Sequence, residues 1–150
     1  MRLTRAGEYG VRCLLYLSSK GVGVLCNRRQ IAAAMGIPSP FLGKIAQQLA
    51  RAGYIEIIRG AKGGLKMVVS PEKLTLLDVV ETVTGEIFLN DCISRPESYN
   101  RSTTCAVHRV WYKARAQLRE TLREATFADL IKEESCWSPC GQAGSNRSIC

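Results

Sequence analysis

The sequence predicts a mainly α-helical chain that contains one small two-stranded β-hairpin. Apolar residues recur at helical spacing in most segments, and glycines stand at the ends of these segments. Two β-rich runs, YIEIIRG and LKMVVS, flank the glycine-rich stretch AKGG, which is typical of a hairpin. The chain has 150 residues, which is enough to bury a core without disulfide bonds.

The first two helices are expected before residue 36. Residues 5–19 place apolar side chains on one face, and Gly21 follows them as a helix-ending residue. Asn27 and Gln30 have the spacing of a capping box, in which each side chain bonds the backbone amide at the other position. This box would open the short helix RRQIAAAM, which Gly36 closes.

The third helix is expected within GIPSPFLGKIAQQLARAGY. Ser39 would cap it, Pro40 suits its first turn because no amide donor is needed there, and Gly53 marks its end. Apolar residues at helical spacing leave polar and basic side chains for the outer surface. Two helices joined by a glycine-containing turn make a helix-turn-helix, and the hairpin that follows completes a winged helix-turn-helix, a DNA-binding fold.

The hairpin tip is expected to form the wing of this fold. Gly60, Gly63 and Gly64 suit a tight turn with positive φ and a close approach to a duplex. Arg59 would enter the minor groove where an A·T-rich step narrows it. The alternative is that the glycines serve the hairpin turn alone.

Positive charge is concentrated in the first part of the chain. Residues 1–70 hold 11 Lys and Arg against only Glu8 and Glu56, whereas residues 71–150 hold 10 basic and 11 acidic residues. This segregation favours a polyanionic partner, double-stranded operator DNA, for a winged helix-turn-helix region over residues 1–72. A small α/β domain with a solvated basic face is the alternative, and it leaves the scarcity of acidic residues unexplained. The expected base-edge contacts are Phe41, Lys44, Gln47 and Gln48, near the cap Ser39, and the expected phosphate contacts are Arg28, Arg29, Arg51, Arg59, Lys62 and Lys66.

Residues 73–132 are expected to hold a sensor loop and a dimerisation helix. A short helix opens at Thr75, a polar loop covers residues 93–104 and is expected to be mobile, and a long amphipathic helix runs over residues 104–125. The apolar stripe of the long helix consists of Val107, Val110, Trp111, Ala114, Leu118 and Leu122. A helix of this length beyond a DNA-binding region indicates a partner surface, hence a homodimer. Residues 133–150 are expected to form a flexible tail that contains cysteines.

The seven cysteines are expected to be thiols or metal ligands. No apolar run approaches the length of a membrane span, and charge interrupts the opening before a signal-peptide core, so a cytoplasmic protein is expected. In that reducing compartment an odd set of cysteines is no disulfide framework, and Cys13 and Cys26 lie in apolar stretches that predict burial. Cys92, Cys105 and His108 combine soft thiolates with an imidazole one helical turn away, which favours metal or cluster binding. Two half-buried thiols and an exposed histidine remain the alternative.

Three motifs in order carry a resemblance over residues 1–132. MRLTRAGEYGVR, IAAAMGIPSPFLGKIAQQLARAGYIEIIRGAKGG and C-x12-C-x2-H-x2-W resemble the IscR and NsrR type of dimeric winged-helix repressors, bacterial sensors of iron–sulfur status, nitric oxide or redox state. The resemblance implies operator binding by the N-terminal half and dimerisation through the long helix. It also implies an iron–sulfur cluster with Cys92 and Cys105 as its first and last cysteines, His108 as a ligand, and Glu8 as an acidic ligand from the other subunit.

The chain departs from this family pattern by lacking a third cysteine between Cys92 and Cys105. Two cysteines, His108 and Glu8 favour a 2Fe–2S cluster over 4Fe–4S. The alternatives are a cluster that takes thiolates from the tail, a zinc site completed by a tail cysteine, and a regulator that senses through its thiols without a cluster. An enzyme with a Cys105 nucleophile is not favoured, because no phosphate-binding loop or paired-carboxylate motif is present. The tail cysteines are Cys136, Cys140 and Cys150.

Overall fold

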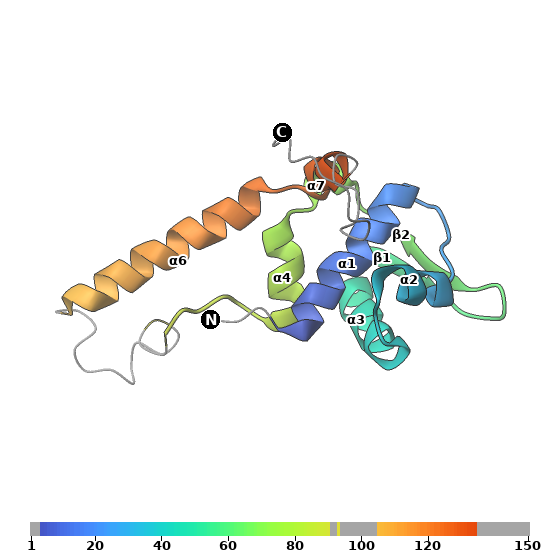
Figure 1. Ribbon diagram of the computed structural model, residues 1–150, viewed down its shortest axis with the longest axis horizontal. Helices are drawn as coiled ribbons and strands as arrows, with labels where there is room; N and C mark the ends of the chain where they lie inside the picture. Colours follow the sequence, from blue (N-terminus) through green and yellow to red (C-terminus); the bar gives the residue numbers. More distant parts are fainter. Residues whose placement is uncertain (1–3, 91–92, 94–104, 135–150) are drawn as a thin grey trace, which may run out of the picture.

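The computed structural model describes residues 4–90, 93 and 105–134 (Figure 1). A compact N-terminal part, called the head, comprises residues 4–84 together with the helix that starts at Phe127. One long helix projects from the head, and the chain then returns to it. Cys92, the expected loop residues 94–104 and the expected tail residues from 135 on lie outside the described residues. Of the loop, Ile93 is described, and its side chain is buried.

The head is built around helix α1 (Arg5–Lys20), which contacts α2 (Arg28–Met35) and α3 (Ser39–Arg51). The side chain of Thr4 caps α1 by accepting a hydrogen bond from the amide of Gly7. The inner face of α1 is apolar and fully buried, and it belongs to one core with residues from α2, α3 and the sheet. Helices α2 and α3 form the expected helix-turn-helix, joined by Gly36 in the left-handed conformation with φ 61°.

The wing is an antiparallel pair of strands, β1 (Ile55–Ile58) and β2 (Gly64–Met67). It is anchored to the residue before α2's cap: the amides of Cys26 and Leu65 each donate to the other's carbonyl, at 2.8 and 2.9 Å. The position of β2 at the base of the wing is therefore fixed relative to the start of α2.

The glycines of the wing act mainly through close packing. Only Gly60 has a positive φ, 109°, so the expectation of positive φ is wrong for Gly63 and Gly64. A Cβ atom at Gly63 would lie 2.2 Å from the carbonyl oxygen of Ile58, and one at Gly64 would lie 2.2 Å from that of Cys26. These two positions need glycine because backbone occupies the space of a side chain.

Two short elements connect the head to the long helix. After the 3-10 turn η1 (Pro71–Lys73), helix α4 (Leu76–Thr84) opens with the capping box of Thr75 and Asp78. One face of α4 adds Val79 and Val83 to the core of the head. Its other face, with Leu77 and Val80, forms a second cluster with Ile87, and Leu118 and Leu122 of the long helix pack against this cluster.

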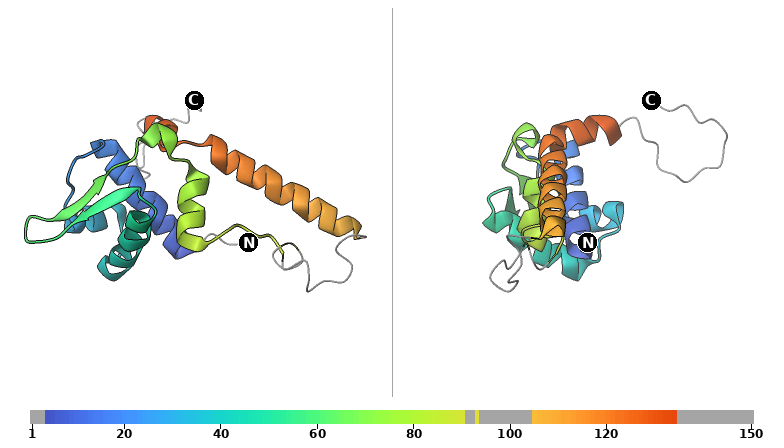
Figure 2. Two further views of the ribbon diagram at one scale, coloured as in Figure 1. Left: turned by 180° about the vertical axis from the view of Figure 1, so that it is seen from behind. Right: turned by 90° about the vertical axis from the view of Figure 1, so that its left-hand side faces the viewer.

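The long helix, α6 (Ala106–Glu124), projects from the head and has no buried residue (Figure 2). Helix α7 (Phe127–Glu134) brings the chain back to the head. Phe127 is fully buried in the core, and its amide donates to the carbonyl of Leu74 at 2.9 Å. The C-terminal end of α6 is therefore fixed on the head, while its N-terminal end lies far from it.

One predicted helix cap and two predicted helix starts differ in detail from the structure. Asn27 caps α2 by accepting from the amide of Arg29, two residues on, so the predicted capping box with Gln30 is wrong. Pro38 is the last extended residue before α3, because its carbonyl already accepts from the amides of Phe41 and Leu42, and Ser39 is the first helical residue rather than the cap.

The long helix starts two residues later than predicted. Cys105 is its N-terminal flanking residue, with φ −79° and ψ 115°, and the first turn begins at Ala106. Its thiol makes no capping hydrogen bond.

Candidate DNA-binding surface and sensor residues

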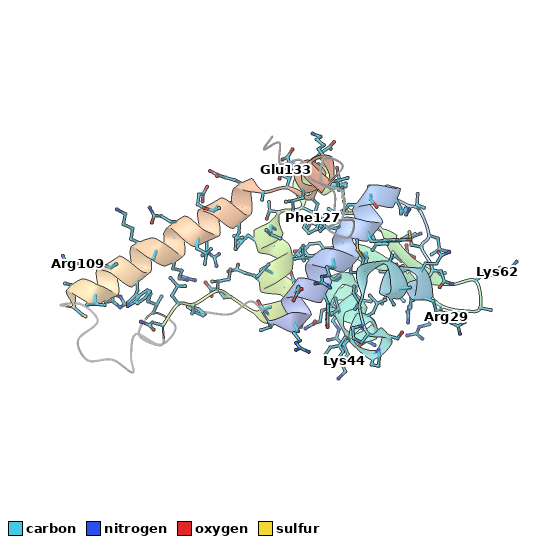
Figure 3. All side chains as sticks on the ribbon, in the orientation of Figure 1. Arg29, Lys44, Lys62, Arg109, Phe127 and Glu133 are labelled. Carbon is cyan, nitrogen blue, oxygen red and sulfur yellow. The ribbon has the colours of Figure 1, made fainter. Side chains whose placement is uncertain are left out.

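Helix α3 is anchored by its apolar face and leaves its polar face free. Leu42, Ile45 and Leu49 are buried, as helical spacing predicts. The exposed side chains of the helix are Ser39, Pro40, Phe41, Lys44, Gln47, Gln48 and Arg51. Figure 3 shows Lys44 projecting outward from α3. This surface can approach a duplex without any change to the core.

Phe41 is an apolar side chain on this otherwise polar surface. It is 47% exposed, and its ring lies edge-on to that of Tyr9 with 5.8 Å between the ring centroids. Helix α1 thus holds the ring at the start of α3, where an apolar group can contact the methyl group of thymine.

A groove of about 560 Å³ separates the start of α2 from the wing. It is lined by Asn27, Arg28, Arg29, Ile58, Arg59, Gly60, Ala61, Gly63 and Gly64. Arg29 and Lys62 project at this end of the head (Figure 3). Three guanidinium groups and the amides at a helix start favour negative charge, so the groove suits backbone phosphate.

The basic candidates differ in whether a carboxylate already neutralises them. Lys66 forms an ion pair of 2.8 Å with Glu56, which stands directly opposite it in the wing. Within the described ranges, no carboxylate lies at ion-pair distance from the remaining six: Arg28, Arg29, Lys44, Arg51, Arg59 and Lys62. Lys66 is therefore the weakest of the proposed phosphate contacts. This ion pair could have been predicted from the sequence, because the register of the hairpin places Glu56 opposite Lys66.

The sensor candidates lie at two separate places in one chain. Glu8 is in the first turn of α1, exposed and paired with Arg12. Cys105 and His108 are half-buried at the start of α6, which Figure 1 shows far from α1. Among the described residues no three ligand-type side chains gather, and Cys92 is not among them. The structure thus brings Cys105 and His108 into neighbouring positions but does not bring Glu8 of the same chain to them.

His108 has a feature that fits a ligand. Its Nδ1 atom is shielded from solvent, and no hydrogen-bond partner for it is found in the described part of the chain. A shielded imidazole nitrogen normally has a partner, and a metal ion is one of the partners that imidazole accepts. Together with the thiol of Cys105, this nitrogen is chemically suited to iron or zinc.

Cys13 and Cys26 are structural thiols, as predicted. Their exposed fractions are 0% and 6%. Burial raises the pKa of Cys13 to about 12, and burial also raises the pKa of Cys26. A metal ligand must be a thiolate, so neither residue is a candidate ligand.

An apolar groove of about 490 Å³ lies between α1, α4 and α6. Leu76, Val80, Ile87, Leu118 and Leu122 are among the apolar residues that line it. Glu8 and Arg12 also line this groove, so the acidic sensor candidate stands beside an apolar surface.

Two arginines of α6 form a network that sequence reasoning missed. Arg115 pairs with Glu86, donates to the carbonyl of Ile87 at 2.7 Å and lies 4.7 Å from the ring of Phe88. Arg119 pairs with Glu81 of α4. The spacing of the two arginines shows only that they share a helix face, and their acidic partners become visible with the tertiary structure.

The comparisons with known proteins agree with this architecture. The family model described as "Rrf2: Iron-dependent Transcriptional regulator" matches residues 3–133. The chain belongs to the Rrf2 family. Protein aau3 of Rhizobium meliloti is 34% identical over 133 residues, covering 88% of this chain and 86% of that protein. The HTH-type transcriptional regulator NsrR of Bacillus subtilis is 29% identical over 135 residues, covering 89% of this chain and 92% of that protein.

Solved structures show the same fold. T. potens IscR matches with a TM-score of 0.70 at 22% identity, covering 94% of each chain. The oxidized form of Staphylococcus aureus CymR matches with a TM-score of 0.69 at 24% identity, covering 88% of this chain and 97% of that one. The predicted fold class and the family resemblance are confirmed. This Rrf2 protein is a DNA-binding transcriptional regulator with a winged helix, and it is not an enzyme. No helix in the described ranges is long and apolar enough to cross a membrane.

Proposed function

We propose that this Rrf2 protein is a homodimeric repressor whose affinity for operator DNA is controlled by an iron–sulfur cluster. The observation that carries the proposal is the division of the chain into two parts. One is the reading surface, which is the exposed, carboxylate-poor face formed by α3, the start of α2 and the wing. The other is a projecting helix that starts with Cys105 and His108. Residues 1–72 would read DNA, residues 73–132 would sense and dimerise, and residues 133–150 would be a tail that contains cysteines.

The dimer is supported by the exposed half of α6. Val107, Val110 and Trp111 are 58%, 66% and 38% exposed, although they continue the apolar stripe that packs on the head at Leu118 and Leu122. Apolar side chains in a row on a projecting helix are typical of a partner surface. A second copy would cover this half of the helix and bring its own reading surface into a symmetric pair.

The cluster would be held by Cys92, Cys105 and His108 of one subunit and Glu8 of the partner subunit. In one chain the start of α6 lies far from α1, which carries Glu8 in its first turn, and this supports an acidic ligand donated by the second copy. Two thiolates with two other ligands favour 2Fe–2S over 4Fe–4S, and an imidazole ligand raises the potential of such a centre. A bound cluster would supply one-electron chemistry, and this chain would supply its ligands and their link to the DNA-binding head.

On DNA, α3 would enter the major groove and the wing would follow the backbone. Phe41, Lys44, Gln47 and Gln48 would read base edges. Arg28, Arg29, Arg51, Arg59, Lys62 and, more weakly, Lys66 would contact phosphates, and Ser39 at the start of α3 would contact the backbone. A symmetric dimer presents two such helices, so the preferred duplex would be palindromic.

The test begins with the colour of anaerobically purified protein and its content of iron, sulfide and zinc. We expect visible absorption and about two irons and two sulfides per subunit, as a 2Fe–2S centre requires. Cys92→Ser and Cys105→Ser should be colourless, whereas replacing Cys136, Cys140 and Cys150 together should leave the spectrum unchanged. Colourless protein with stoichiometric zinc would establish the zinc alternative, and colourless protein without metal would leave direct thiol sensing.

The second part of the test compares cluster-loaded and cluster-free protein on a duplex that the protein itself selects from a randomised library. A difference of about 5- to 150-fold in affinity is expected, which is typical of allosteric coupling. Equal affinities at one salt concentration would defeat the sensor mechanism even if a cluster is present.

The reading residues are tested by separate substitutions. Gln47→Ala should lower the preference for the selected duplex by about 1–3 kcal/mol, the usual size of one base contact. Arg59→Ala should weaken all duplexes alike and reduce the salt slope by about one unit. Arg123→Ala, an exposed arginine on α6, serves as the matched control and should change neither. A Gln47→Ala variant that weakens random DNA equally would place Gln47 among the phosphate contacts.

A further inference from the structure

Residues 86–90, here called the strap, follow helix α4 and run toward the N-terminal half of α6 (Figure 1). Both backbone groups of Ile87 are bonded to a helix. Its amide donates to Oε1 of Glu81 on α4 at 3.1 Å, and its carbonyl accepts from Nε of Arg115 on α6 at 2.7 Å. Because the side chain of Ile87 is also buried between these helices, the strap is fixed to both of them.

Two arginines of α6 complete this attachment. Arg115 pairs with Glu86, and its guanidinium carbon lies 4.7 Å from the ring centroid of Phe88. Arg119 pairs with the carboxylate of Glu81. The side chains of Arg115 and Arg119 are only 15% and 22% exposed. Charge-assisted hydrogen bonds at such shielded positions are stronger than exposed ion pairs, so the start of the strap is firmly attached to α6.

The far end of the strap is held by Trp111. In the orientation of the Asn90 amide that gives both of its polar groups a partner, Oδ1 accepts from the indole Nε1 of Trp111 at 3.0 Å. The amide nitrogen then donates to the carbonyl of Leu89 at 3.1 Å. The single indole donor of Trp111 is thus satisfied within the subunit, although 38% of the residue is exposed.

The face of α6 that contacts the strap also carries His108. Seven residues are nearly two full helical turns, so His108 stands almost in line with Arg115. The half-buried positions of α6 are His108, Ala114, Arg115, Leu118, Arg119 and Leu122. Val107 and Val110 lie on other parts of the helix surface and are exposed. His108 therefore lies on the side of the strap, whereas the two valines are left for a partner chain.

The first proposed cluster cysteine comes directly after the strap in sequence. Cys105 and His108 are already carried by α6 and its N-terminal flank, so Cys92 is the one proposed ligand of this subunit's sensor region that the helix does not hold. Cys92 follows Asn90 by two residues, and two residues of extended chain span at most about 7 Å. Holding Asn90 at Trp111 therefore restricts how far this ligand can lie from the turn of His108.

We propose that Trp111 is a positioning residue that brings the proposed ligands together before a metal binds. Its N–H holds Asn90 and thereby keeps Cys92 beside the face of α6 that carries His108. A ligand set that is already ordered loses less conformational freedom when it closes on a metal, so the site binds more tightly. The inference rests on the proposed function for the identity of the ligands, but the effect of the hydrogen bond on the two thiols requires no metal.

The test measures the effective concentration of the Cys92 thiol at Cys105 in metal-free, full-length protein whose three tail cysteines are replaced by Ser. In a glutathione buffer the two thiols form one disulfide while glutathione disulfide is reduced to two molecules of glutathione. Peptide mapping of the monomer band from a non-reducing gel quantifies this bond. Trp111→Phe keeps an aromatic ring but removes the donor, and it should lower the effective concentration by about 2- to 5-fold, as expected for one partly exposed hydrogen bond.

The companion variants separate the hydrogen bond from general loosening of the helix. Asn90→Ala should give the same loss as Trp111→Phe, and the double variant should lose no more than either single variant. Because Asn90 is exposed, its replacement leaves the core intact. Asn90→Asp keeps an acceptor oxygen and should retain the wild-type value. Trp137→Phe removes the other indole of the chain and is the matched control, which should change nothing.

Equal effective concentrations in wild type, Trp111→Phe and Asn90→Ala would overturn the proposal. Additive losses in the double variant would overturn it as well, because the two side chains would then act separately. The assay contains no metal, so its outcome is independent of the colour of the purified protein. Colourless protein with the expected thiol effect would refute the cluster and leave the strap standing, whereas coloured protein without that effect would refute the positioning role alone.

Discussion

The head and the projecting half of α6 differ in whether their apolar side chains are buried within the chain. The head buries one continuous core to which α1, α2, α3, the wing, α4 and α7 all contribute. Helix α6 has 19 residues and none is buried, although its apolar side chains are spaced as regularly as those of α3. Amphipathic spacing therefore does not tell whether a helix packs on its own chain or on another.

The same contrast holds for charge. In the head, six basic side chains on the reading surface have no carboxylate within ion-pair distance in the described ranges. On α6, Arg115 and Arg119 are paired with Glu86 and Glu81. Positive charge in the head thus remains available to a polyanion, whereas these two charges of α6 hold the helix against α4 and the segment that follows it.

The largest expected effect tests whether α7 belongs to the head. Phe127→Ala removes a fully buried ring from the core and should lower the free energy of unfolding by about 3–5 kcal/mol. Urea unfolding followed by circular dichroism measures this loss. Val107→Ala on exposed α6 is the control and should cost under about 0.5 kcal/mol in a monomer. Equal losses would mean that the contrast between the two regions is false.

The next effect concerns the exposed half of α6. Val110→Glu places a carboxylate within the apolar stripe, where a dimer interface would have to bury it. We expect the dimer to weaken by about 100-fold, since an unpaired buried charge is costly. Sedimentation velocity measures the dimer, and the wild-type unfolding transition of the monomeric head should persist. Unchanged association would show that this stripe faces solvent or another partner.

Substituting two glycines of the head compares a site crowded by backbone with a site on the open surface. Gly64→Ala would force a Cβ atom against the carbonyl of Cys26 and should destabilise the fold by about 1–3 kcal/mol. Gly43→Ala on α3 meets no neighbouring group and should stabilise the helix by about 0.5–1 kcal/mol. Thermal unfolding of both variants gives the comparison, and the same sign for both would contradict it.

The smallest effect distinguishes the thiols of the two regions. Because burial raises the pKa of Cys13 from 9.0 to about 12, the folded state keeps a proton that the unfolded chain loses above pH 9. The contribution of this residue to stability therefore falls as the pH rises past 9. At pH 8, iodoacetamide and peptide mapping should find Cys105 of metal-free protein modified, with Cys13 and Cys26 protected. Rapid labelling of Cys13 would show that the head opens easily.

Local signals in the sequence predicted much of the fold. The helix predicted to open at Thr75 does so, through a capping box with Asp78 that needs only residues three apart. The start of α3 was misplaced by one residue, since Pro38 and Ser39 both suit the boundary and the carbonyl of Pro38 decides it. The burial of Phe127 against Leu74 depends on chain segments far apart in sequence, so periodicity contains no sign of it.

In the candidate site, too, some features follow from local sequence and others depend on contacts between distant residues. The outer face of α3 follows from helical spacing alone, and the structure leaves those side chains exposed. The contact of Arg12 with Met35 joins residues 23 apart and could not be anticipated from either local pattern. The proposed ligand set spans two copies of the chain, and Cys92 lies outside the described residues, so its assembly stays a prediction.

The close packing of the wing limits how this surface can diversify. Gly63 is pressed against β1, and Gly64 is pressed against the residue that precedes the cap of α2. New side chains are consequently best accommodated at residues 61 and 62, at the tip, because Gly60 has a positive φ and the two glycines at the base are crowded by backbone. A wing transplanted into another regulator would need the backbone before α2 to follow the same path, because Gly64 and Leu65 contact backbone atoms of Cys26 and Asn27. The wing and the start of α2 therefore form one structural unit.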